Sequence, residues 1–157
     1  MVIAPAGFGK TYTIAECVAS YRGEKQVLVL THTHAGIASL KEKFQLKNIP
    51  SSAYQLETIC GFALNLVKTY HLNKDEIPSL SDADSLFHFA IEHAIKILKA
   101  LPIKKYLAIK YDHLIVDEYQ DCTVGQHQMI MSLSTILQTH ILGDPLQGIF
   151  DFGREHI

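Results

Sequence analysis

The chain has 157 residues, of which 48% are hydrophobic, enough for one well-buried core with a small appendage. Its formal net charge of −2 excludes a protein-wide basic field, so nucleic acid would have to bind a local surface. No apolar stretch is long enough to cross a membrane and no signal peptide precedes the first motif, so we expect a cytoplasmic protein without a membrane partner. The three cysteines lack metal-ligand spacing, which indicates reduced thiols without zinc.

Hydrophobic periodicity along the chain predicts alternating strands and helices. Strands are expected near 2–4, 26–30, 113–116 and 139–142. Helices are expected over 12–21, 35–44, 57–70, from about 84 to Pro102, and from about 123 to 137. Ser81 with Asp84 is predicted to cap the fourth helix, and Thr123 with Gln126 to form a capping box on the fifth. This order predicts an α/β fold in which a parallel sheet with right-handed crossovers is flanked by helices.

A glycine-containing loop lies between the first predicted strand and the first predicted helix. It reads Ala4-Pro5-Ala6-Gly7-Phe8-Gly9-Lys10-Thr11. Backbone N–H groups of such a loop and the following helix N-terminus bind phosphate. Lys10 would reach the β- and γ-phosphates, and the Thr11 hydroxyl would bind Mg²⁺. The first glycine of the general P-loop pattern is Ala4 here, and the alternative is a flexible turn that ends by chance in Lys-Thr.

Two acidic residues follow the apolar run 113–116. A buried parallel strand that delivers acids at its carboxyl end completes the metal site of a P-loop fold. Asp117 is predicted to hold Mg²⁺, and Glu118 to orient and deprotonate the attacking water. The alternative, an acidic surface loop, fits poorly with the four apolar residues before it.

Three strand-end motifs together resemble the UvrD/Rep-type superfamily 1 DNA helicases. Residues 4–11 are similar to the family's A-x-x-G-x-G-K-T, 117–121 to its D-E-x-Q-D, and 143–150 to its G-D-x-x-Q-S-I-Y. In this family Ala4 is part of the match. The resemblance implies an α/β P-loop NTPase of the RecA-like type that binds ATP and Mg²⁺. It also implies that Gln147 senses the γ-phosphate and that Gln120 couples the nucleotide site to the DNA site.

Two further segments resemble the family's contacts with single-stranded DNA. Residues 30–33 resemble L-T-F-T, and 58–62 resemble T-x-H-[GSA]-F, with Cys60 in the place of the usual histidine. The resemblance implies DNA contacts from Thr31, His32, Thr58, Phe150 and Phe152. Aromatic side chains can stack on any base, so the two phenylalanines could grip a strand without reading its sequence. The alternatives are core packing for the phenylalanines, and strand-end and helix-cap roles for the two threonines.

The resemblance covers nearly the whole chain, so residues 1–157 are expected to be the first motor domain of such a helicase. A short helical accessory insertion is expected at about 65–110. We expect residues 1–157 to lack the family's second motor domain, which supplies arginines to the γ-phosphate, so a partner domain or chain would have to supply them. We therefore expect an ATP-dependent DNA helicase motor that hydrolyses ATP weakly by itself. The alternatives are a nucleotide-dependent switch or binding module and a superfamily 1 RNA helicase.

Overall fold

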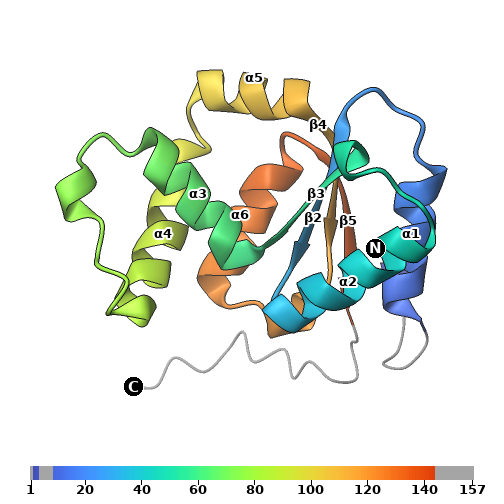
Figure 1. Ribbon diagram of the computed structural model, residues 1–157. Helices are drawn as coiled ribbons and strands as arrows, with labels where there is room; N and C mark the ends of the chain where they lie inside the picture. Colours follow the sequence, from blue (N-terminus) through green and yellow to red (C-terminus); the bar gives the residue numbers. More distant parts are fainter. Residues whose placement is uncertain (1, 4–8, 144–157) are drawn as a thin grey trace.

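The computed structural model describes residues 2–3 and 9–143. Five parallel strands form one sheet in the order β1-β5-β4-β2-β3. The strands are β1 (Val2–Ile3), β2 (Gln26–Thr31), β3 (Tyr54–Thr58), β4 (Tyr111–Val116) and β5 (Gln138–Gly143) (Figure 1). The predicted α/β fold with a parallel sheet flanked by helices is therefore confirmed.

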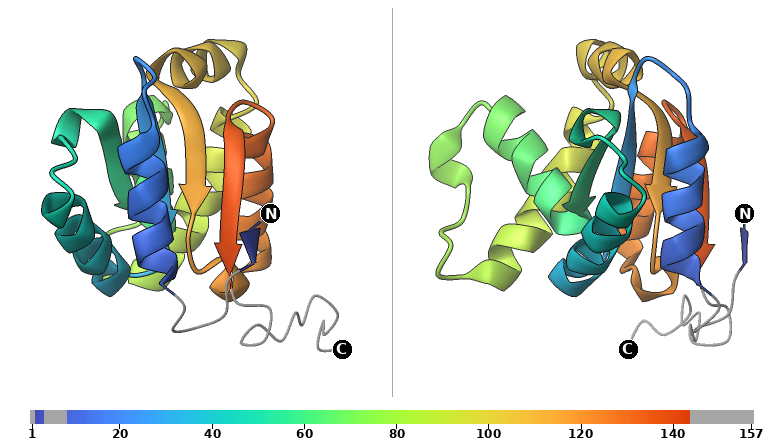
Figure 2. Two further views of the ribbon diagram at one scale, coloured as in Figure 1. Left: turned by 90° about the vertical axis from the view of Figure 1, so that its right-hand side faces the viewer. Right: turned by 45° about the vertical axis from the view of Figure 1, so that its right-hand side comes forward.

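Helices cover both faces of this sheet (Figure 2). One face packs against α1 (Lys10–Ser20) and α2 (His34–Leu46), and the other against α3 (Ile59–Tyr70), α4 (Ala83–Ile97) and α6 (Val124–Ser134). Successive residues of β2 serve the two layers in turn: Val27 and Val29 face α1 and α2, whereas Leu28 and Leu30 face α3, α4 and α6. Burial on both faces explains why this strand is an unbroken apolar run.

Strand β3 is absent from the sequence prediction, which assigned residues 57–70 to one helix. Residues 54–58 instead pair with 27–31 of β2, and helix α3 begins only at Ile59. Every residue of β3 is half-buried, and the strand mixes polar with apolar side chains. Its conformation depends on pairing with β2 rather than on a local apolar pattern, so periodicity could not reveal it.

Two predicted helix boundaries are also wrong. Asp82, not Ser81 with Asp84, caps α4, because its Oδ1 accepts the Ser85 N–H at 3.2 Å. Helix α4 ends at Ile97, and Pro102 lies in the first turn of α5 (Leu101–Lys110). Proline is well suited to that turn because its missing N–H would have no partner within the helix.

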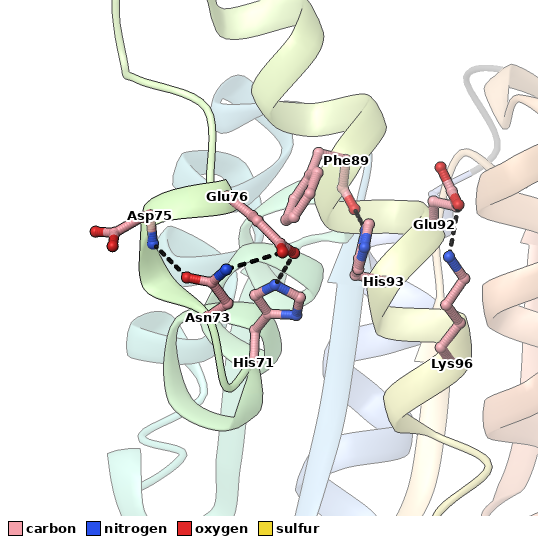
Figure 3. A network of polar contacts seen from close by, with 8 residues as sticks. All are labelled: His71, Asn73, Asp75, Glu76, Phe89, Glu92, His93 and Lys96. Carbon is pink, nitrogen blue, oxygen red and sulfur yellow. Dashed lines mark hydrogen bonds and ion pairs between the residues drawn. The ribbon is translucent and has the colours of Figure 1, made fainter.

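A polar cluster ties the connection between α3 and α4 to both helices (Figure 3). His71 Nε2 lies 3.1 Å from Glu76 Oε2, and Asn73 Nδ2 donates to Glu76 Oε1 at 2.8 Å. These hydrogen bonds, first that of Asn73 and then that of His71, lower the pKa of Glu76. The His93 ring stacks on Phe89 at 3.8 Å between centroids and meets His71 edge-on at 5.0 Å. The cluster thus fixes the turn between the two helices.

Among the described residues, no helix combines the length and apolarity that a membrane crossing requires.

The predicted capping box at the start of α6 is present. Thr123 Oγ1 accepts the Gln126 N–H at 3.3 Å, and Gln126 Oε1 accepts the Thr123 N–H at 2.9 Å. We expect Thr123→Ala to lower the free energy of unfolding by about 0.5–2 kcal/mol, because it leaves a helix N–H unpaired. Urea unfolding would measure this, with Thr123→Ser, which keeps the hydroxyl, as the control. Equal stability of the alanine and serine variants would contradict the expectation.

Candidate functional site

The carboxyl ends of the strands meet at one edge of the sheet, drawn at the bottom of Figure 1. The register pairs Leu30 with Val116 and Val116 with Ile141, while Ile3 pairs with Gly143. The Asp117 N–H extends the ladder by donating to the Leu30 carbonyl at 2.8 Å. The described residues that follow β2 and β4 are therefore brought together, as the sequence predicts, although they lie far apart in the chain.

The described end of the predicted phosphate loop has the backbone geometry of a loop entering a helix. Gly9 has φ 76° and ψ 32°, a left-handed conformation that favours glycine. Its carbonyl accepts the Thr13 N–H at 2.8 Å, which closes the first turn of α1. Lys10 and Thr11 lie in this turn and are half-buried. The remaining predicted loop residues, 4–8, lie outside the described residues.

Asp117 is a buried carboxylic acid at the centre of this edge, with 6% of its surface exposed. Burial, followed by the nearby Glu118 charge, raises the pKa of Asp117; the Glu118 N–H, which donates to its Oδ1 at 2.9 Å, and the positive charge of Lys10 oppose that rise. Among the described residues, no three His, Cys, Asp or Glu side chains form a metal site made by protein alone. One carboxylate and a threonine hydroxyl fit Mg²⁺, which is commonly held by one or two carboxylates together with substrate phosphates.

Glu118 has a backbone conformation that is unusual for a residue with a side chain. Its φ of 54° and ψ of 35° are left-handed, and only Asn48 shares a positive φ among the described non-glycine residues. Such conformations cost about 1–3 kcal/mol and often occur at functional sites. The Glu118 carboxylate accepts a hydrogen bond from Thr31 Oγ1 at 3.3 Å. A strained backbone and a hydroxyl donor thus hold this carboxylate beside Asp117.

Gln120 lies against the end of β5. A side chain at Gly143 would place its Cβ 3.0 Å from Gln120 Oε1, so glycine allows this close approach. The third predicted motif begins at Gly143, so Gln120 of the acidic motif lies beside the first residue of the third. Gln147, Phe150 and Phe152 lie outside the described residues.

The predicted DNA-contacting residues near β2 and β3 have contacts within the protein. Thr31 is fully buried, and the half-buried His32 donates its Nε2 N–H to the Asp121 carbonyl at 2.5 Å. Thr58, the partner of Thr31 in the sheet register, caps α3 by accepting the Gly61 N–H at 2.9 Å. The strand-end and helix-cap roles are thus present, and a DNA role for these residues stays a prediction.

Sequence reasoning missed the contact between Thr31 and Glu118, which joins residues 87 positions apart. The available signal was that both residues follow buried apolar strands, which parallel pairing places side by side. The order of strands in the sheet was needed to use it.

A parallel sheet, a left-handed glycine that opens the first helix, and a buried Asp117 followed by a half-buried Glu118 at a central strand end define a P-loop nucleotide-binding domain. Residues 1–153 match the AAA_19 family model, described as an AAA domain. The chain belongs to this family, and it is a UvrD/Rep-type superfamily 1 helicase motor domain.

Curated relatives share the match over most of this chain. It is 27% identical over 153 residues to an ATP-dependent helicase/nuclease subunit of Lactococcus lactis subsp. cremoris (strain SK11). It is 26% identical over 153 residues to the exonuclease/helicase subunit RexA of Lactococcus lactis subsp. cremoris (strain MG1363). Each alignment covers 93% of this chain and 12% of the relative. The chain therefore spans about an eighth of the length of these proteins.

Proposed function

We propose that this chain is the ATP-binding motor domain of a helicase or translocase that moves along single-stranded DNA by hydrolysing ATP. The observation that carries the proposal is the buried Asp117 with its neighbour Glu118 at the sheet edge where Lys10 begins α1. Membership of the helicase family and relatives named ATP-dependent helicase/nuclease subunits support it.

Each group at this edge has a role that its chemistry suits. Residues 4–11 would bind the phosphates of ATP, with the Lys10 ammonium on the β- and γ-phosphates. Thr11 and Asp117 would hold Mg²⁺, which neutralises phosphate charge when bound. Glu118 would accept a proton from the attacking water. Gln147 would sense the γ-phosphate, and Gln120 would link this site to DNA.

Single-stranded DNA would run along the same edge, over His32 and Thr58, with Phe150 and Phe152 stacking on bases. Thr31 is fully buried, so it would support the DNA-contacting residues from below. The helices within 65–110 would form the accessory insertion. Arginines from a second motor domain or partner chain would complete the γ-phosphate site. Because an arginine of this kind contributes about 10³–10⁵ in rate, hydrolysis by this chain alone should be slow.

Titration of the purified chain with a fluorescent ATP analogue and Mg²⁺ tests the nucleotide site. We expect Lys10→Ala to weaken binding by about 10- to 100-fold, because it removes a charged hydrogen bond worth about 1.5–3 kcal/mol. The control is Lys99→Ala, an exposed lysine without an ion pair in the described part of the chain. Equal affinities for wild type and Lys10→Ala would contradict the proposed site.

Single-stranded DNA added to the same protein tests the motor. Acceleration of the slow hydrolysis supports a DNA-dependent motor, and preference for single-stranded RNA would favour an RNA helicase instead. Nucleotide binding with no response to either strand would favour a nucleotide-dependent switch.

A further inference from the structure

The end of β2 holds the turn that follows Asp117 at two points. Thr31 Oγ1 donates to Glu118 Oε2 at 3.3 Å, at the start of the turn. The next residue, His32, donates from Nε2 to the Asp121 carbonyl at 2.5 Å, at the end of the turn. Between the two contacts lies the short 3₁₀ helix Tyr119–Asp121. One strand end thus contacts both ends of the acidic motif.

The Thr31 hydroxyl has little freedom to move. Thr31 is 0% exposed, and a Cβ added at Gly36 would lie 2.5 Å from its Oγ1. Helix α2 therefore packs its first turn directly on the hydroxyl, and only glycine leaves the space. Threonine is also stiff at χ1, because its Cβ carries two heavy atoms. The hydroxyl is fixed between α2 and the Glu118 carboxylate.

Within the described part of the chain, Thr31 is the only group that donates a hydrogen bond to the Glu118 carboxylate. The backbone of Glu118 sets where its side chain starts, and Thr31 sets where its oxygens lie. A catalytic base misplaced by about 1 Å can lose about 10²-fold in rate. The placement of these oxygens is therefore the feature on which proton transfer depends.

We propose that Thr31 is the positioning residue for Glu118, and that His32 links this positioning to nucleic acid bound at the surface where β2 ends. The inference rests on the proposed function. In the reaction, the water oxygen bonds to the γ-phosphorus, the bond to the bridging oxygen of ADP breaks, and the water proton passes to Glu118. A strand of nucleic acid that displaces His32 would shift the turn at Asp121 and, through Thr31, the carboxylate of Glu118.

Single-turnover hydrolysis of radiolabelled ATP by the 157-residue chain tests the positioning role. We expect Thr31→Val, which keeps the shape and removes the hydroxyl, to slow hydrolysis by about 10-fold or more with unchanged affinity for the nucleotide. Thr31→Ser should retain the wild-type rate. A rate loss without an affinity loss, rescued by serine, is not what a purely structural defect would give.

Glu118→Gln in the same assay separates the two proposals. If it slows hydrolysis while Thr31→Val does not, the positioning role is overturned and the nucleotide site stands. If Glu118→Gln has no effect, the proposed catalytic function itself fails.

Gly36→Ala provides a second route should Thr31→Val fold poorly. It keeps the Thr31 hydroxyl but pushes on it, and alanine favours the helix in which it stands. Slower hydrolysis with unchanged nucleotide affinity is expected. Wild-type rates in whichever of these two variants is folded, checked by thermal unfolding, would overturn the positioning role.

For the link through His32, we expect His32→Ala to lower the ratio of the DNA-stimulated to the unstimulated rate. An unchanged ratio would overturn that part of the inference.

Discussion

Glu118→Gln should slow ATP hydrolysis by about 10²- to 10⁴-fold while leaving nucleotide binding nearly unchanged. Glutamine keeps the size of the side chain but cannot accept the proton of the attacking water, and this range is the usual contribution of a general base. Since Glu118 lies beside the buried Asp117 and not among the residues expected to touch phosphate, affinity should survive the change. Hydrolysis under single-turnover conditions and titration with a fluorescent nucleotide measure the two quantities separately.

Glu57→Gln is a matched control for this prediction. Glu57 lies near the end of β3, where its carboxylate accepts hydrogen bonds from Gln55 and Asn65. Glu57 lies at the same carboxyl-end side of the sheet as Glu118, but on the outermost strand. A comparable rate loss in both variants would mean that general loss of negative charge, rather than the base itself, is being measured.

Of the variants considered for stability, Phe44→Ala should lower the free energy of unfolding most. Phe44 is 0% exposed in the layer between α2 and the sheet, and its ring meets that of Tyr54 edge-on at 4.5 Å between centroids. Truncation of a buried phenylalanine costs about 3–5 kcal/mol, through lost burial and the cavity left behind. For a domain of this size the midpoint of thermal unfolding should fall by about 6–20 °C. Calorimetry or circular dichroism would measure the shift.

Leu46→Ala, two positions along the same helix, supplies the comparison. Leu46 is 68% exposed, so its removal should change stability by less than about 0.5 kcal/mol. If the two variants unfold at the same temperature, Phe44 does not pack in the core as described.

The sequence could predict those parts of the fold that a local pattern of residues indicates. Strands β2, β4 and β5 lie within a few residues of their predicted positions. Apolar runs mark β2 and β4, and the Ile-Leu pair before Gly143 marks the end of β5. The capping box of Thr123 and Gln126 is likewise local. Strand β3 could not be predicted, since its half-buried residues become a strand only by pairing with β2.

For the site, the motifs indicated which residues would lie at one edge, and strand register brings Asp117 and the start of α1 there. The left-handed backbone of Glu118 and the hydroxyl of Thr31 on its carboxylate could not be predicted. Both depend on which strands are neighbours and on the close approach of Gly36. These are properties of the assembled sheet rather than of any segment.

The strand order also has a consequence for how the domain folds. Strand β1 is an outermost strand of the sheet and pairs with β5 alone. Residues 2–3 therefore pair only with 142–143 in the described chain. Closing so long a loop is the most costly contact in entropy, and it is repaid only after the intervening strands are in place. During synthesis, the residues leading into the phosphate loop must wait for the fifth strand to leave the ribosome. Nucleotide binding is therefore expected only after β5 has been made and has paired with β1.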